Sequence, residues 1–405
     1  MIALAWRNLW RQPRRTLLTL AVIMLAGVVT IFLLALQVGS YATMKDNTLK
    51  VFDGFAQVQQ PDYLDDPNIR HTIAQPEQLA QSIERIDGVD TVALRGATYA
   101  LLSLDQHSIG AYIVGVQPEM EAQVSSIAHS LRAGHYLTPG NAAEVAIGEA
   151  LARNLGVGVG DHITLLGMGL DGSVATDVLT VRGIFASGDT SLDRQLAEMP
   201  LRRFQADFAM DGLANVLVIS GRGLAQVQAA LPDVHQLTKP QGLTVHSWAE
   251  LEPGLESAIR LDASTSMLWY VSLVVVVVVL LLNTLLMSVL ERTREFGVLL
   301  ALGMRDGAIG RMVWLELLLL LGIGLVTGMV LGSGLVVWYS IHGLSLPGAE
   351  GAFSQWGLPS RMYPQLSAFS LLTGPTAIAL VTTIAGVFPY LRIRRLRPVA
   401  AMRTA

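Results

Sequence analysis

The chain has 405 residues, of which 52% are hydrophobic and 15% are charged, and its formal net charge is −4. Soluble globular proteins average about 25% charged residues, so this composition excludes an ordinary soluble protein and indicates that part of the chain lies in a membrane. The absence of cysteine excludes a disulfide framework.

The first long apolar run predicts a transmembrane helix at residues 16–40. Because Pro13-Arg14-Arg15 precedes it, this region also resembles a twin-arginine export signal. A secretory signal has an apolar stretch of only about 7–15 residues. The run here is longer and three further runs follow, which favours an uncleaved membrane helix.

Residues 41–266 form a region of ordinary globular composition, large enough to bury its own core. We expect an α+β domain with two subdomains, roughly residues 41–110 with 210–250, and 111–209. The first is predicted from two similar β-α-β patterns, which flank the second. The predicted strands are 55–59, 89–94, 109–116, 145–147, 162–166, 178–184, 216–220 and 243–246, and the predicted helices are 76–86, 149–155 and 223–231.

The sequence of this domain contains no pattern that predicts a catalytic site or a metal site. The eight histidines show no spacing typical of metal ligands. Gly156-Val-Gly-Val-Gly160 follows a predicted helix and precedes a strand, whereas a dinucleotide-binding loop follows a strand and opens a helix. No phosphate-binding loop of the Walker type occurs, so we expect no enzyme activity in this chain.

Residues 246–266 predict an amphipathic stalk before the second membrane helix. Trp248, Leu251, Leu255 and Ile259 have the spacing of one helical face, and Pro253 is expected to kink the helix or to mark its start.

The other apolar runs predict membrane helices at residues 267–290, 312–338 and 366–391. In the third helix, Gly324, Gly328 and Gly332 recur every four residues and predict a face for close helix packing. That packing could lie within one subunit or between two. Asn283 and Glu316 are the conspicuous polar residues of the runs, so no polar path for a solute is predicted.

Arginines near the ends of the runs set the expected orientation. They cluster before the first run, between the second and third, and after the fourth, whereas Arg361 alone lies between the third and fourth. The positive-inside rule then places both termini and residues 291–311 in the cytoplasm. Residues 41–266, with 14 Lys and Arg against 27 Asp and Glu, and the short loop 339–365 lie outside.

The loop after the second helix carries mixed charge beside apolar residues. Glu291, Arg294 and Glu295 have the spacing of one helical face. Arginines that anchor at lipid headgroups would explain the cations but not the glutamates. A short amphipathic helix that docks into a soluble partner would account for both, and the residue pattern alone leaves the two interpretations equally open.

The segment from Glu291 to Gly303 resembles the hallmark of ABC-transporter permeases of the FtsX/MacB/LolC-LolE class, also called type VII, and is most similar to the lipoprotein-releasing branch. Residues 5–19 resemble the amphipathic helix that begins these proteins, and residues 396–403 resemble their C-terminal end. Residues 115–119 and 131–160 add to the likeness, as does the layout of four helices.

The resemblance implies that residues 291–311 hold a coupling helix seated in an ATPase, that residues 1–15 form a cytoplasmic helix, and that residues 392–405 form a cytoplasmic tail. The implied docking residues are Glu291, Arg292, Thr293, Arg294, Glu295, Phe296, Gly297 and Gly303, and those of the N-terminal helix are Arg7, Asn8 and Arg11.

The implied partners are two copies of a cytoplasmic ATPase, which would bind ATP and Mg while this chain holds no cofactor, and a second permease, identical or homologous. Membrane lipids and a lipoprotein cargo or a periplasmic adaptor are also expected, and nucleic acid is not.

The implied function is ATP-driven release of lipoproteins, or a similar amphipathic cargo, from the bacterial inner membrane. Two alternatives stay open: an exporter of peptides or small molecules without a fused ATPase, and a mechanotransmission protein that activates a periplasmic partner without transport.

Overall fold

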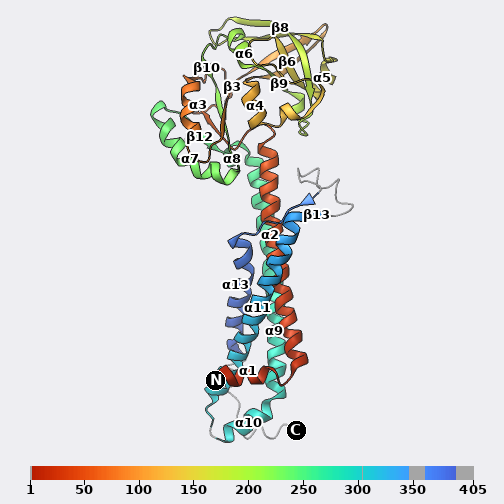
Figure 1. Cartoon of the computed structure of the whole chain (residues 1–405), viewed down its shortest axis with the longest axis vertical. Coiled ribbons are helices and arrows are strands. Elements are labelled where there is room, and N and C mark those ends of the chain that lie inside the picture. Colours follow the sequence, from red (N-terminus) through yellow and green to blue (C-terminus); the bar gives the residue numbers. More distant parts are fainter. Residues whose placement is uncertain (1, 303, 346–360, 389–405) are drawn as a thin grey trace. The chain divides into compact units, whose positions relative to one another are not determined.

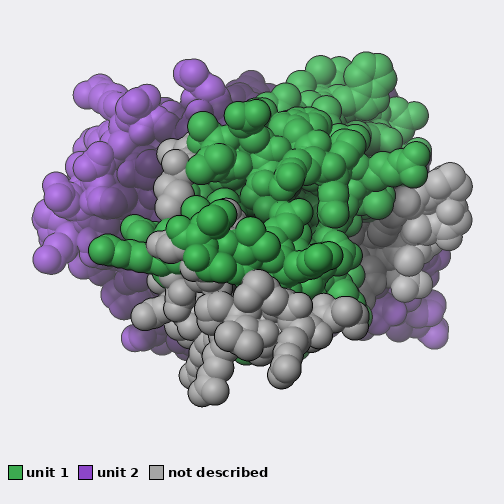
Figure 2. Space-filling view, turned by 90° about the horizontal axis from the view of Figure 1, so that it is seen from below, with its two compact units in different colours: residues 1–44, 258–405 green, residues 45–257 purple. Residues whose placement is uncertain are grey.

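The computed structural model describes residues 2–302, 304–345 and 361–388 (Figure 1). The chain divides into two compact units, coloured separately in Figure 2. Unit 1 comprises residues 1–44 and 258–405, and unit 2 comprises residues 45–257. Gly303, the expected tail 392–405 and the middle of the expected loop 339–365 lie outside the described residues.

Within its described residues, unit 1 contains four helices that are long and apolar enough to cross a membrane. They are α2 (Pro13–Leu49), α9 (Pro253–Glu291), α11 (Asp306–His342) and α13 (Ala368–Ala385). Their outward side chains are themselves apolar, as in Leu18, Val279 and Val330, which are 70%, 58% and 66% exposed. Such a surface suits lipid rather than water, because large apolar patches are rare on soluble monomers.

The described part of unit 1 also contains short helices and strands. Helix α1 (Ile2–Leu9) precedes α2, and α10 (Thr293–Ala301) follows α9. Strands β13 (Leu344–Ser345) and β14 (Arg361–Met362) pair antiparallel between α11 and α13. The protein is thus an α-helical membrane protein with an α+β domain between its first two long helices (Figure 1).

Helices α2 and α9 are much longer than their apolar runs, and parts of both belong to unit 2. Pro253 marks the start of α9 rather than a kink. The residue before a proline avoids helical geometry, and Glu252 accordingly has φ −122° and ψ 66°. The prediction of one amphipathic face from Trp248 to Ile259 is therefore wrong, because Trp248 lies in a separate helix, α8 (Trp248–Leu251).

Unit 2 is built on a ten-stranded sheet with the order β12-β1-β11-β3-β4-β9-β6-β8-β5, in which β7 pairs with β3 and β8. The long central hairpin joins β3 (Thr91–Leu104) to β4 (His107–Val116). The other strands are β1 (Ala56–Gln59), β5 (Leu131–Gly134), β6 (Glu144–Gly148), β7 (His162–Met168), β8 (Val174–Phe185), β9 (Leu196–Pro200), β11 (Val216–Ser220) and β12 (Thr244–Ser247). A separate pair links β2 (Ile73–Ala74) to β10 (Leu213–Ala214).

Five longer helices accompany this sheet: α3 (Pro76–Glu84), α4 (Pro118–Val124), α5 (Glu149–Leu155), α6 (Leu201–Asp207) and α7 (Leu224–Thr238). One core cluster joins Leu102 and Ile113 of the central hairpin to Leu151 of α5 and Phe204 of α6. The strands and helices predicted for this domain are present, most of them with shifted ends, whereas α4, α6, β2, β5, β9 and β10 were not predicted. The division into two subdomains stays a prediction, because one sheet runs through both.

The glycine face of α11 lies against α2 of the same chain. A Cβ added at Gly324 would lie 2.7 Å from the Ile23 side chain, and one at Gly328 would lie 2.9 Å from the Met24 carbonyl oxygen. One at Gly332 would lie 3.3 Å from the Cα of Val28. Glycine therefore permits the close approach of these two backbones. Of the two alternatives left open by the sequence, the structure shows packing within one chain.

Candidate functional site

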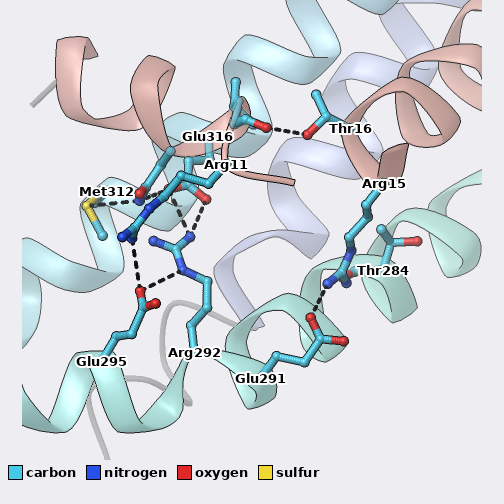
Figure 3. A network of polar contacts seen from close by, with 11 residues as sticks. Arg11, Arg15, Thr16, Thr284, Glu291, Arg292, Glu295, Met312 and Glu316 are labelled. Carbon is cyan, nitrogen blue, oxygen red and sulfur yellow. Dashed lines mark hydrogen bonds and ion pairs between the residues drawn. The ribbon is translucent and has the colours of Figure 1, made fainter. Parts of the chain in front are cut away.

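A network of charged residues lies at the end of the bundle where α1 and α10 meet the long helices (Figures 1 and 3). Arg15, in the first turns of α2, forms an ion pair of 2.8 Å with Glu291, the last residue of α9. Its second terminal nitrogen donates to the carbonyl oxygen of Thr284, also on α9. Arg15 therefore binds α9 at two places, Thr284 and Glu291, which lie about two helical turns apart.

Glu316 of α11 is the most buried member of the network, with 6% of its surface exposed. Its Oε1 accepts a hydrogen bond of 2.6 Å from Nδ2 of Asn8 in α1. Nη1 of Arg292, between α9 and α10, lies 3.3 Å from both carboxylate oxygens. A buried charge needs such partners. Glu316 thereby holds α1, α11 and the start of α10 together.

Glu295 completes the network at the start of α10. Its Oε2 lies 3.3 Å from Nη1 of Arg11 and 3.5 Å from Nε of Arg292 (Figure 3). Exposed pairs of this kind contribute little free energy singly. They nevertheless join α10 to the turn between α1 and α2. A hydrogen bond of 2.6 Å from Thr16 Oγ1 to the Leu9 carbonyl oxygen also stabilises this turn.

The network surrounds a cavity of about 280 Å³. Its lining includes the charged side chains of Arg11, Arg292 and Glu316 and also leucines of α9 and α11, such as Leu281 and Leu317.

The buried side of α10 is apolar. Phe296, 1% exposed, packs with Val289, Ile309, Met312 and Val313. The Arg292 guanidinium lies 5.3 Å from the centre of the Phe296 ring, a cation–π distance. Gly297 is also buried, and the Thr293 hydroxyl donates to the Val289 carbonyl oxygen. These contacts fix one face of α10 on the bundle.

The opposite face of α10 is exposed. Arg294 and Val298 lie four residues apart on α10 and so share a helical face. Leu302 directly follows α10, and its N–H donates to the Val298 carbonyl oxygen at 3.0 Å, which keeps it on the same side. Val298 is 49% exposed, Leu302 is 79% exposed and Arg294 is exposed as well. We call these three residues the α10 outer face. It presents apolar area beside a cation, as a docking helix does.

One prediction about this region is wrong. Glu291, Arg294 and Glu295 do not share a helix face, since α9 ends at Glu291 and α10 begins at Thr293. The chain turns at Arg292, so Glu291 pairs with Arg15 while Glu295 pairs with Arg11. The physical reason is the long-range ion pairs, which sequence spacing within one segment does not reveal.

Helix α1 has an amphipathic arrangement. Ala5 and Leu9 are buried, whereas Trp6 and Trp10 are 44% and 48% exposed, with their rings 6.0 Å apart. Exposed tryptophans are typical of a membrane–water interface. Arg7, predicted to belong to the site, lies exposed on α1, and Asn8 and Arg11 point into the network.

Sequence reasoning missed two members of the network. Arg15 was counted only among the cations that set orientation, and Glu316 only as a polar residue in an apolar run. An ionisable residue within a membrane helix is by default a candidate for function, so Glu316 carried a usable indication. No group of three or more His, Asp or Glu suited to a metal occurs in the part of the chain that the structure describes.

Comparison with known families assigns both parts of the chain. Residues 16–234 match the MacB-like periplasmic core domain, and residues 267–398 match the FtsX-like permease C-terminal domain. Since the first match alone covers more than half of the sequence, the chain belongs to the FtsX/MacB/LolC family of ABC-type permeases. It is accordingly an inner-membrane protein with a periplasmic domain.

Among individual proteins, the chain is similar to the lipoprotein-releasing system transmembrane protein LolC of Xylella fastidiosa. For strain 9a5c and for strain Temecula1 the identity is 26% over 320 residues, which is 75% of this chain and 75% of each relative.

Two solved structures also resemble the chain. The extracellular domain of the noncanonic ABC-type transporter YknZ from Gram-positive bacteria has 13% identity and a TM-score of 0.35, and covers 48% of this chain and 98% of that one. The periplasmic region of MacB from Actinobacillus actinomycetemcomitans has 13% identity and a TM-score of 0.38, and covers 50% of this chain and 92% of that one.

Proposed function

We propose that this permease couples ATP hydrolysis by a separate cytoplasmic ATPase to a conformational change of its periplasmic domain, and so releases lipoproteins or a similar amphipathic cargo from the inner membrane. The observation that carries the coupling is the placement of α10. Arg292, Glu295 and Phe296 hold its inner side on the bundle, and the α10 outer face remains exposed.

A push on α10 would reach the long helices directly. Arg292 links α10 to Glu316 of α11, and Glu295 links it to Arg11 beside α2. The Arg15–Glu291 pair joins α2 to the end of α9. Helices α2 and α9 each continue into unit 2, so the same two helices belong to both units. Two copies of the ATPase, with their ATP and Mg, and a second permease complete the proposed assembly.

The orientation belongs to the same proposal. Arg7 lies on α1, and Arg11, Arg15 and Arg292 belong to the charged network beside it. By the positive-inside rule, these arginines support a cytoplasmic location for this end of the bundle. Protease added to spheroplasts without an outer membrane should then cut within residues 45–257. Complete protection of this domain would contradict the orientation.

The cargo is proposed from the relatives, whose name describes lipoprotein release. The test is to purify the tagged chain from its own bacterium and to identify what accompanies it by mass spectrometry. An ABC ATPase together with a lipoprotein supports the proposal. An ATPase that accompanies the chain with a periplasmic hydrolase and no lipoprotein would favour mechanotransmission instead.

A further inference from the structure

The sheet of unit 2 is joined to α2 and α9 through two short connections that leave it at one place. The first runs from the end of α2 at Leu49 to the start of β1 at Ala56, and the second runs from the end of β12 at Ser247 to Pro253. Strands β1 and β12 are paired, with Ala56 opposite Ser247. Both connections therefore leave adjacent strands at the same end.

A buried arginine holds the first connection. Arg95, on the central strand β3, is 3% exposed, and its Nη2 donates to the carbonyl oxygen of Phe52 at 2.7 Å. The guanidinium also lies 4.0 Å from the centre of the Phe52 ring, within the range of a cation–π interaction. A residue of the connection is thus bound through both its backbone and its side chain.

The Arg95 guanidinium is also bound by a residue of α4. Nε and Nη2 of Arg95 donate to the two carboxylate oxygens of Glu121 at 3.0 and 2.6 Å, and Glu121 is 0% exposed. Just after α4, the backbone N–H of Ser126 donates to the carbonyl oxygen of Lys50 at 2.7 Å. We call Lys50, Phe52, Arg95, Glu121 and Ser126 the junction clamp.

Arginine suits this position for a geometric reason. Its planar fork has five donors and can serve a carboxylate and a carbonyl oxygen at the same time. Replacing a buried ion pair by packed apolar residues is often neutral for stability. Stability alone therefore gives little reason for an arginine here, whereas holding three segments in a fixed geometry does.

We propose that Arg95 is a positioning residue that transmits movement of α2 to the sheet of the periplasmic domain. This inference rests on the proposed function, since it describes the path from α2 to the domain. Movement of α2 pulls on Phe52, and the junction clamp carries the displacement to β3 and α4 instead of letting the connection stretch.

The test uses the full complex of two permeases and the ATPase in nanodiscs. The double variant Arg95→Met with Glu121→Leu removes the side-chain contacts of the clamp and removes both charges of its buried ion pair together. We expect ATP hydrolysis to stay within about twofold of wild type and cargo release to fall at least tenfold. The matched control is Arg203→Met with Asp177→Leu and Asp207→Leu, which removes another ion-paired cluster of the same domain, with N–O distances of 2.7 and 3.2 Å, and should leave release unchanged.

A rescue experiment separates transmission from a structural role. Lys50 and Ser126 are joined by a backbone hydrogen bond, so Lys50→Cys with Ser126→Cys places two thiols near each other in a chain that has no other cysteine. Loss of free thiol on oxidation measures whether the disulfide forms. In the double variant, oxidation should restore release and a reductant should abolish it again. The inference is overturned if the double variant releases cargo at the wild-type rate, if it loses ATP hydrolysis, or if the formed disulfide restores nothing.

A second readout needs no cargo. Spin labels at Glu119→Cys on α4 and Leu261→Cys on α9 report the distance between the two units, which ATP should change in wild type and not in the double variant. If the distance responds in this way but no lipoprotein is released by wild type, the proposed cargo is wrong and the clamp stands. If both proteins respond equally, the clamp is wrong.

Discussion

Asn8 and Glu316 lie 308 positions apart in the sequence and are joined by a hydrogen bond of 2.6 Å. The bond joins α1 to α11, the third membrane helix. The same Glu316 carboxylate binds Arg292, which directly precedes α10. The chain thus brings its N-terminus and the start of α10 to a single buried carboxylate.

Replacing Glu316 by alanine should destabilise unit 1 strongly. The change leaves Arg292 without its buried partner, and breaking one side of a buried pair costs roughly 3–5 kcal/mol. Asn8→Ala removes one hydrogen bond to a charged group and should cost about 1.5–3 kcal/mol. Thermal unfolding of the detergent-solubilised chain measures both. An Asn8 variant less stable than the Glu316 variant would contradict the central place of Glu316.

The α10 outer face should bind the ATPase. Leu302→Glu places a charge where the proposal needs an apolar contact, so co-purification of the ATPase should fall about tenfold or more, as at an interface hot spot. Val174→Glu is the matched control, since Val174 is 72% exposed in unit 2. Equal amounts of ATPase with both variants would remove α10 from the docking surface.

The packing of α11 on α2 predicts a sharp difference between two glycines of one helix. Gly328→Leu forces a side chain against the Met24 carbonyl oxygen, whereas a Cβ at Gly334 meets no atom within 4 Å. Overpacking of this kind costs about 1–3 kcal/mol. The Gly328 variant should lose monodispersity and thermal stability in detergent, and Gly334→Leu should behave as wild type. Equal behaviour of the two variants would show that α2 and α11 do not approach at Gly328.

The periplasmic domain should lose stability as the pH rises from about 5 to about 8. Burial, with the nearby Glu121 carboxylate as a further cause, raises the pKa of Glu198 to about 8. Burial and the neighbouring Asp53 raise the pKa of Glu252 to about 7. A carboxyl group whose pKa is higher in the folded state stabilises the fold below its unfolded pKa, and this contribution is lost as the pH rises through the folded pKa.

Thermal unfolding of the full chain between pH 5 and pH 9 measures this effect. Glu198→Gln keeps the acceptor for the Tyr136 hydroxyl, which now donates to Glu198 at 2.6 Å, and it cannot ionise. The variant should therefore lose less stability than wild type over this range. A variant with the same pH dependence as wild type would show that Glu198 does not titrate there.

The local pattern of the sequence was enough to predict the membrane helices and most of the sheet, because hydrophobic runs and periodicity are local properties. Strand β9 was missed because Glu198 and Pro200 interrupt its apolar character, although all five of its residues are buried. The Arg15–Glu291 pair joins residues 276 positions apart. A segment read by itself cannot show such a contact, so the charges at 291–295 were grouped on one face.

The proposed function is tested most directly by measuring the release of a fluorescent triacylated lipoprotein from proteoliposomes that contain the permease and its ATPase. We predict release into the soluble fraction with ATP and Mg, none with a non-hydrolysable ATP analogue, and faster ATP hydrolysis when the lipoprotein is present. An active ATPase whose rate ignores the lipoprotein, with no lipoprotein released, would contradict the proposed function.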